Sequence, residues 1–319
     1  MSEPPILLEM VRKASRRRAL SRKTENAYVN QIGRFQQFYV GRDLQEVGKG
    51  GVDAFLEYLE AAKNLAVSTR NQALSALTFL YRDVFGQKEI PQMESVKRVK
   101  PRTKTPVIFT PEEVRAVLSK MRGDTLLVAA LMYGAGLRLS EAVALRVGDI
   151  DFERREIVVR DARTGAKDRT TMLPEMLIRQ LKRHLINVRY IYEDDYLAND
   201  GKIFLPAVMR GQNSDTEREW KKQFAFPSHN LTFGKSLRRN HLAESTVQKA
   251  VTEAILKANV LKEVCCQTFR YSFAARLFEK NHDIRRIQNL LGHKNLKTTA
   301  VYMNFARYGA GVVRSPLDI

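Results

Sequence analysis

The chain has 319 residues, in which 54 lysines and arginines outnumber 35 aspartates and glutamates, so its formal net charge is +19. A hydrophobic content of 44% suffices for a buried core, which excludes a wholly disordered basic protein. The cysteines, Cys265 and Cys266, are adjacent, which excludes a disulfide framework and a zinc site built on cysteine spacing. No segment approaches the roughly 18 uninterrupted apolar residues of a membrane span. We therefore expect a cytoplasmic protein without a membrane segment and with a polyanionic partner, most commonly nucleic acid.

The distribution of charge predicts two domains joined by a basic linker. Residues 1–94, 95–110 and 111–319 carry net charges of +3, +5 and +11. Residues 95–110 contain no acidic residue, and Pro101 and Pro106 disfavour a helix there, so an extended segment is expected. The segment is either a solvated linker, or its basic side chains lie along the phosphate backbone of a nucleic acid. The candidate phosphate contacts are Lys97, Arg98, Lys100, Arg102 and Lys104.

Residues 1–94 predict an all-helical domain. Apolar spacing indicates a helix from a cap at Thr24 to about Val40, and a second helix over 52–63. A third helix is expected from a cap at Ser68 to a stop at Gly86. Basic side chains border these helices, and the candidate DNA contacts among them are Arg22, Lys23 and Arg70.

Residues 111–319 predict a mainly helical domain with one β-hairpin. Thr110 and Pro111 are typical of a helix start, and an apolar helix over 125–134 is broken by Gly134 and Gly136. A short helix follows from about Ser140, and strand-like periodicity over 156–160 and 169–173 indicates the hairpin. Further helices are expected over 175–189, 244–258, 270–280 and 284–291, and residues 193–240 are expected to form a long irregular insertion.

Four short motifs follow one another in this second domain. They are Gly134-Ala-Gly-Leu-Arg138-Leu-Ser-Glu141, Gln267-Thr-Phe-Arg270-Tyr-Ser-Phe-Ala274, Leu290-Leu-Gly-His293 and Thr298-Thr-Ala-Val-Tyr302. Their order and spacing resemble the tyrosine recombinase (phage integrase) family. The resemblance implies a SAM-like helical core-binding domain and a mainly α catalytic domain with a small β-sheet, which together form a C-shaped clamp on DNA.

The resemblance also implies a role for each motif. Tyr302 would be the nucleophile, and its phenol would hold the cut strand as a 3′-phosphotyrosyl intermediate. Arg138 and Arg270 would stabilise the negative charge that develops on the phosphate, without a metal or any other cofactor. His293 would donate a hydrogen bond to the same phosphate or assist proton transfer. The family works as a homotetramer around two DNA sites.

Two positions depart from the family's pattern. Gln267 stands where the family usually has histidine, and a glutamine can hydrogen-bond a phosphate but cannot transfer a proton near pH 7. The hairpin has Thr164 where the family usually has the lysine that protonates the leaving oxygen. Lys167, three residues later, is either a substitute acid or a surface residue. Both departures bear on how active the protein is.

The insertion at about 193–240 resembles the extra segment of integron integrases. That branch integrates and excises gene cassettes, and it recognises a folded single-stranded site by its extrahelical bases. Trp220 or Phe224 could stack on such a base, and Lys221 and Lys222 could meet phosphates. The alternative for the insertion is that its aromatic residues pack on one another. The alternatives for the protein are an integrase of ordinary duplex sites and a catalytically impaired, recombinase-derived DNA-binding protein.

Overall fold

A computed structural model of the chain describes residues 6–61, 67–87, 106–160, 168–199, 218–232, 238–305 and 316–318. The chain forms two compact units, Met1–Lys104 and Thr105–Ile319, each with a hydrophobic core of its own. The division between them falls within the predicted linker at 95–110, whose five basic residues lie outside the described ranges. No helix in the described ranges is long and apolar enough to cross a membrane.

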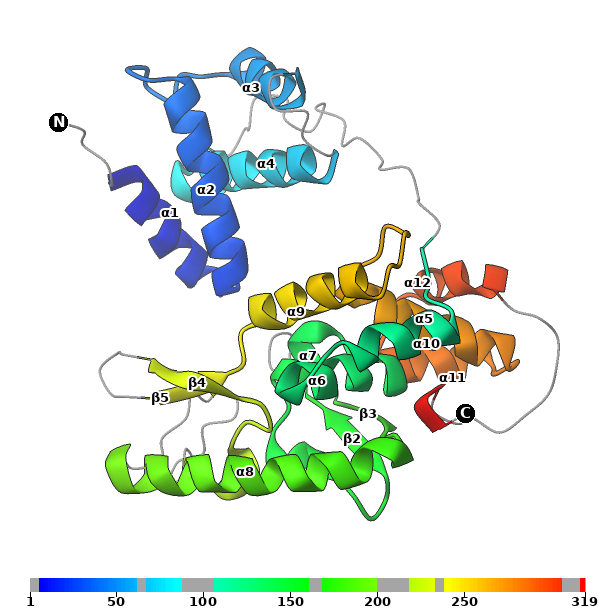
Figure 1. Cartoon of the computed structure of the whole chain (residues 1–319). Coiled ribbons are helices and arrows are strands. Elements are labelled where there is room, and N and C mark those ends of the chain that lie inside the picture. Colours follow the sequence, from blue (N-terminus) through cyan, green and yellow to red (C-terminus); the bar gives the residue numbers. More distant parts are fainter. Residues whose placement is uncertain are drawn as a thin grey trace. The chain divides into compact units, whose positions relative to one another are not determined.

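All the regular secondary structure in the described residues of the N-terminal unit is helical. Its helices are α1 (Ile6–Arg17), α2 (Arg22–Phe38), α3 (Lys49–Ala61) and α4 (Val67–Phe79), and a π-helical turn (Leu80–Val84) continues α4 (Figure 1). Helix α2 packs against both α1 and α4. The core between the helices consists of buried aliphatic and aromatic side chains, among them Ile32, Phe35, Phe55, Leu56 and Leu77.

Three helix starts in this unit differ from the prediction, and one helix was not predicted. Helix α3 begins at Lys49, three residues before the predicted start. The side chain of Ser21 accepts a hydrogen bond from the backbone N–H of Thr24, so Ser21 caps α2 and Thr24 lies in its first turn. Helix α4 already includes Val67, so Ser68 lies inside it. Helix α1 was missed because its dense basic residues obscure the apolar positions, such as Val11, that face the core.

The C-terminal unit is built around a buried apolar helix, α6 (Gly123–Gly134), in which every residue from Leu127 to Gly134 is buried. Several helices pack against α6 (Figure 1). The other helices of this unit are α5 (Pro111–Ser119), α7 (Leu139–Val143), α8 (Glu175–Asn199), α9 (Glu244–Lys257), α10 (Cys266–Glu279), α11 (Ile284–Leu291) and α12 (Leu296–Ala300). The predicted start at Thr110 is confirmed, since Thr110 and Glu113 form a capping box.

The predicted β-hairpin is confirmed and is part of a three-stranded antiparallel sheet. The strands β1 (Ile150–Asp151), β2 (Glu156–Val159) and β3 (Arg169–Met172) are adjacent in that order, and Ile157 pairs with Thr171. The Thr171 hydroxyl donates a hydrogen bond to the carbonyl of Ala135 over 2.8 Å. This bond joins β3 to the end of α6, where the first of the four motifs begins.

The expectation of an irregular insertion over 193–240 was wrong for residues 193–199, 227–232 and 238–240, whereas residues 218–226 contain a short 3₁₀ helix but no α-helix or strand. Helix α8 runs on to Asn199, and strands β4 (Pro227–Thr232) and β5 (Arg238–His241) form a two-stranded antiparallel sheet. The helix continues because the polar stretch after Arg189 contains no proline or glycine, and because Arg189 forms an (i, i+4) ion pair with Glu193 at 2.7 Å.

Candidate active site

The first motif forms a tight turn between α6 and α7 that presents Arg138. Gly136 has a φ of +66°, and a Cβ atom there would lie 2.5 Å from the ring of Phe273, so only glycine fits. Arg138 caps α7, with its backbone N–H donating to Glu141 Oε2 over 2.8 Å and its guanidinium donating to Oε1 over 2.6 Å. The Arg138 side chain is 36% exposed, so it reaches toward solvent.

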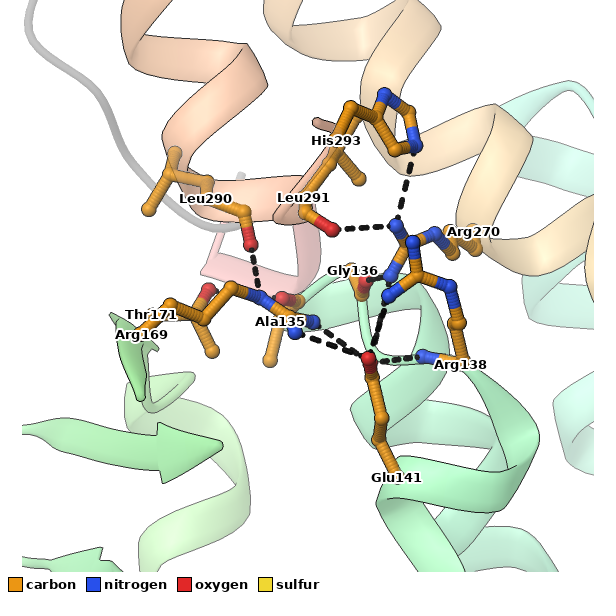
Figure 2. Close-up of polar contacts among 10 residues, drawn as sticks. All are labelled: Ala135, Gly136, Arg138, Glu141, Arg169, Thr171, Arg270, Leu290, Leu291 and His293. Carbon is orange, nitrogen blue, oxygen red and sulfur yellow. Dashed lines mark hydrogen bonds and ion pairs between the residues drawn. The ribbon is translucent and has the colours of Figure 1, made fainter. Parts of the chain in front are cut away.

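Arg270 lies on α10 and is almost completely buried, at 2% exposure. Its guanidinium donates to the carbonyls of Gly136 over 2.7 Å and Leu291 over 2.5 Å, and lies 3.4 Å from Glu141 Oε2 (Figure 2). Burial, followed by the charge of Arg138, lowers the pKa of Arg270 to about 9. It is therefore still a cation at pH 7, held in one orientation by two backbone carbonyls.

His293 lies just beyond α11, whose end is fixed by Gly292 in the left-handed conformation at φ +62°. Its Nε2 is 3.2 Å from Arg270 Nη2, and its Nδ1 is 2.8 Å from the hydroxyl of Thr299. Because a guanidinium can only donate, Nε2 accepts from Arg270 and the ring proton is on Nδ1. Burial and then the positive charges of Arg270 and Arg138 lower the pKa of His293 to about 4. The imidazole is therefore neutral at pH 7.

Tyr302 lies in a 3₁₀ turn (Val301–Phe305) that packs against α10, and it is 5% exposed. It belongs to a buried cluster with Phe273 and Leu291, and its ring centroid is 5.7 Å from that of Tyr271. Burial and the neighbouring Tyr271 raise the pKa of Tyr302 to about 12, although Arg270 and Arg138 oppose the rise. The phenol is therefore protonated at neutral pH.

Sequence reasoning missed two contributors to this site, Glu141 and Arg169. Arg169, the first residue of β3, donates from Nη1 to Glu141 Oε1 over 2.9 Å, from Nη2 to Oε2 over 2.6 Å, and from Nε to the carbonyl of Leu290 over 2.9 Å (Figure 2). Burial disfavours the Glu141 carboxylate, but hydrogen bonds and charge from Arg169, with Arg138 and Arg270, outweigh it and lower its pKa to about 2. The alternation of side chains along a strand could have shown that Arg169 points inward, because Arg169 and the buried Thr171 lie two residues apart on the same face of β3.

Four of the six predicted catalytic residues lie close enough to interact electrostatically: Arg138, Arg270, His293 and Tyr302. Gln267 is half-buried on α10, one turn before Arg270 and so on the same helix face. Lys167, like Thr164, lies outside the described residues. Sequence order alone does not give the contacts among Arg138, Arg270 and His293, which come from three separate segments.

The predicted DNA contacts are distributed over both units. Arg22 and Lys23 are exposed at the start of α2, whereas Arg70 is 14% exposed and pairs with Glu60 at 2.8 Å. The Trp220 ring packs 5.5 Å from Tyr192 and 5.0 Å from the guanidinium of Arg189.

The segment around Trp220 is anchored to the rest of the unit. Lys221 is exposed, and Lys222 forms an ion pair with Glu219 at 3.3 Å. Phe224, another candidate for base stacking, is 4% exposed beneath the Arg146 guanidinium, which lies 3.8 Å from its ring centroid. Arg146 also donates to the Lys222 carbonyl over 2.8 Å. Phe224 is therefore part of the packing of the unit and is not available to a base.

Comparison with known proteins identifies the family. Residues 108–307 match the Phage integrase family, and residues 7–90 match its N-terminal SAM-like domain. The chain belongs to the phage integrase family. An integrase/recombinase of Escherichia coli is 35% identical over 322 residues, which cover 99% of this recombinase and 95% of the relative. The tyrosine recombinase XerA of Thermococcus kodakarensis is 30% identical, over 84% of this recombinase and 83% of the relative. These relatives confirm the predicted class of enzyme, a tyrosine recombinase.

Solved structures confirm the fold of the recombinase. A structure of the XerH site-specific recombinase bound to its difH substrate matches with a TM-score of 0.62 and 18% identity, over 94% of this chain and 82% of that one. A lambda integrase dimer bound to a COC′ core site matches with a TM-score of 0.63 and 16% identity, over 97% and 98%. The prediction of a SAM-like helical domain and a mainly α catalytic domain with small sheets is thus confirmed.

Proposed function

We propose that this recombinase cuts and rejoins DNA through a covalent bond to Tyr302. The Tyr302 oxygen attacks the scissile phosphorus, the bond from phosphorus to the 5′ oxygen breaks, and the 5′ oxygen leaves with a proton as a hydroxyl. The reverse attack by the 5′ hydroxyl of another strand restores the phosphodiester and frees Tyr302. The observation that carries this proposal is the convergence of Arg138, Arg270 and His293 beside the buried tyrosine.

The two arginines suit a phosphate-binding role. The bound phosphate carries extra negative charge in the transition state, and a fixed guanidinium stabilises this charge without reorganisation. Arg270 is fixed by two carbonyls, and Arg138 is exposed enough to meet a ligand from solvent. Their charges also lower the cost of forming the Tyr302 phenolate, because both act against the raised pKa of that phenol.

His293, Gln267 and Lys167 complete the proposed catalytic set. An arriving phosphate adds negative charge next to His293, which raises the pKa of the imidazole from about 4 and allows it to donate to the phosphate. Gln267, on the helix face of Arg270, supplies a neutral hydrogen bond. Lys167 is the candidate donor of the proton to the leaving 5′ oxygen, with a solvated surface position as its alternative.

DNA is the proposed substrate. The net charge of +19 matches a polyanion, and XerH and lambda integrase, which share the fold, were solved on DNA. The proposed phosphate contacts are the five basic residues of the linker together with Arg22, Lys23 and Arg70, and the clamp on DNA stays a prediction from the family resemblance. Four copies would act together on two sites, as in the family that the motifs resemble.

For the biological reaction, the proposal is integration and excision of gene cassettes, as in integron integrases. The segment around Trp220 resembles the extra segment of integron integrases, which supports this proposal. Trp220, Lys221 and Lys222 would contact a folded single-stranded site. Recombination of ordinary duplex sites is the alternative. A comparison of covalent complex formation on folded bottom-strand and double-stranded cassette sites decides between them, and equal use of the two substrates would contradict the integron assignment.

The chemistry is tested with a nicked suicide substrate that traps the covalent complex. We expect a denaturation-resistant protein–DNA complex from the wild-type chain and none from Tyr302→Phe, because phenylalanine lacks the attacking oxygen. Both proteins should bind the same DNA equally, as measured by gel shift. Binding by the wild-type chain without any covalent complex would instead favour a silenced DNA-binding protein, which Gln267 and Thr164 make the second candidate.

A further inference from the structure

A carboxylate, Glu141, lies inside a site that has to bind an anion. Its side chain is 13% exposed and its oxygens contact Arg138 and Arg270, which are the two arginines proposed to hold the phosphate. An ionised carboxylate there repels a phosphodiester and competes with it for the same N–H donors. Some other cation must therefore neutralise Glu141 if both arginines are to act on DNA.

Arg169 has the geometry of that cation. Its Nη1 and Nη2 atoms reach both oxygens of Glu141, at 2.9 Å and 2.6 Å, in the bidentate arrangement that gives the strongest ion pairs (Figure 2). Arg270 is more distant, at 3.4 Å from a single oxygen. Arg138 makes one close side-chain contact, at 2.6 Å. Among these three arginines, only Arg169 engages both carboxylate oxygens with its side chain.

Arg169 is also held in place by contacts other than its pair with Glu141. It is 16% exposed, its Nε donates to the carbonyl of Leu290, and its stem packs on Gly292, where a Cβ atom would lie 2.7 Å from its Cδ. Arg138, at 36% exposure, is the arginine that can turn from Glu141 to a phosphate. The contact with Leu290 also joins β3 to the segment that leads into His293.

We propose that Arg169 is a positioning residue: it retains Glu141 as its own counter-ion, so that Arg138 and Arg270 are released to the scissile phosphate. The inference rests on the proposed function, since it assigns a task to the phosphate-binding arginines. Arg169 itself does not touch the DNA. Without Arg169, the Glu141 carboxylate forms its ion pairs with Arg138 and Arg270. These two arginines then stabilise the negatively charged transition state less.

The experiment compares Arg169→Gln, Arg169→Lys and the double variant Glu141→Gln/Arg169→Gln in the full chain with the nicked suicide substrate. For Arg169→Gln we expect the rate of covalent complex formation at saturating DNA to fall about 10- to 100-fold. This is the range of rate loss expected when one hydrogen bond to a charged group is removed. Arg169→Lys, which keeps the charge but loses the bidentate geometry, should lose less. The double variant should regain most of the rate, because the competing carboxylate is gone. Arg154→Gln, which removes a charge that is 80% exposed, is the matched control and should cleave like the wild type.

The pH dependence supplies a second readout. In Arg169→Gln, the charged or titratable groups that face the Glu141 carboxyl from the described residues are Arg138, Arg270 and the neutral His293. With one cation fewer, the pKa of Glu141 rises and mild acid protonates it. The cleavage rate of this variant relative to the wild type should therefore increase as the pH falls from 7 to 5. A role confined to folding would lower cleavage without this recovery and without rescue by Glu141→Gln.

Failure of this inference is distinguishable from failure of the proposed function. If the wild type cleaves DNA and Arg169→Gln cleaves it equally fast, the role of Arg169 is overturned but the proposed function is not. The same holds if the double variant cleaves no faster than Arg169→Gln. A wild-type chain that forms no covalent complex overturns the proposed function. The pairing is then tested by urea unfolding, in which Arg169→Gln should lower the midpoint and the double variant should restore it, and additive losses would contradict it.

Discussion

At the scale of single residues, charge and burial set the protonation states on which the proposed chemistry depends. In the free chain, Glu141 is ionised, His293 is neutral and Tyr302 is a protonated phenol. Burial keeps Tyr302 protonated, burial and nearby guanidinium charges together keep His293 neutral, and guanidinium groups keep Glu141 ionised in spite of burial. In the proposed reaction, the Tyr302 phenol must therefore lose its proton as it attacks the phosphate.

His293 should make the stability of the folded chain depend on pH. Its folded pKa of about 4 lies below the ordinary value of 6.5, so the unfolded chain binds a proton first and stability falls as the pH drops from 6.5 toward 4. Allowing for partial exposure, we expect a loss on the order of 1 kcal/mol between pH 7 and pH 5.

Urea unfolding at the two pH values measures this effect, with His293→Gln as the comparison. The pKa of His282 is also lowered, mainly by burial, so the wild-type slope contains both histidines. Only the difference between the wild type and His293→Gln reports on the active-site residue. An unchanged pH dependence in the variant would contradict the prediction.

At the scale of elements, the site is assembled at the ends of helices. The turn between α6 and α7, the start of β3 and the end of α11 each contribute a backbone carbonyl or a side chain to the Arg270 and Glu141 contacts. Gly136 makes this possible, since its positive φ and lack of a side chain let the turn approach Phe273 on α10. Packing between elements therefore decides where the arginines point.

Gly136→Ala tests this dependence. The variant combines a left-handed backbone with a Cβ atom 2.5 Å from Phe273, so we expect destabilisation by about 2 kcal/mol or more, together with reduced covalent complex formation. Gly123→Ala is the matched control, because Gly123 also has a positive φ, of +56°, but has nothing within 4 Å of the added atom. Equal losses in the two variants, measured by urea unfolding, would show that packing at Gly136 is unimportant.

At the scale of the whole molecule, the positive charge of the linker is expected to determine how strongly DNA binding depends on salt. The two units fold around separate cores, and the segment predicted to link them carries five basic residues and no acidic residue. If these residues neutralise phosphates, each contributes about 0.9 to the slope of log affinity against log salt concentration.

Lys97→Gln/Arg98→Gln should therefore reduce that slope by about 2 and weaken binding to all DNA sequences alike. The control is Arg115→Gln/Arg154→Gln, which removes the same charge from exposed side chains paired with Glu112 and Asp151. Titrations at several salt concentrations give both slopes. The same change of slope in both double variants would mean that net charge, and not the linker, determines the salt dependence.

Much of the fold was predictable, because its signals are local. The apolar helix α6, the capping box at Thr110 and the strand alternation of β2 and β3 each depend on residues a few positions apart. The helix ends that were predicted wrongly depended on weaker sequence signals. Ser21 and Thr24 are both acceptable caps, and α8 continues through a polar stretch that composition alone would assign to a loop.

The sequence by itself determined the family and the class of enzyme, and its four motifs in a fixed order singled out Arg138, Arg270, His293 and Tyr302 as the proposed catalytic residues. Only the tertiary structure placed Arg169 on Glu141 and set the protonation states of Glu141 and His293. These depend on interactions between segments that are far apart along the chain, such as Arg270 with Glu141, which are separated by 129 positions. Electrostatic interactions and desolvation act through space, so the pattern of neighbouring residues does not encode them.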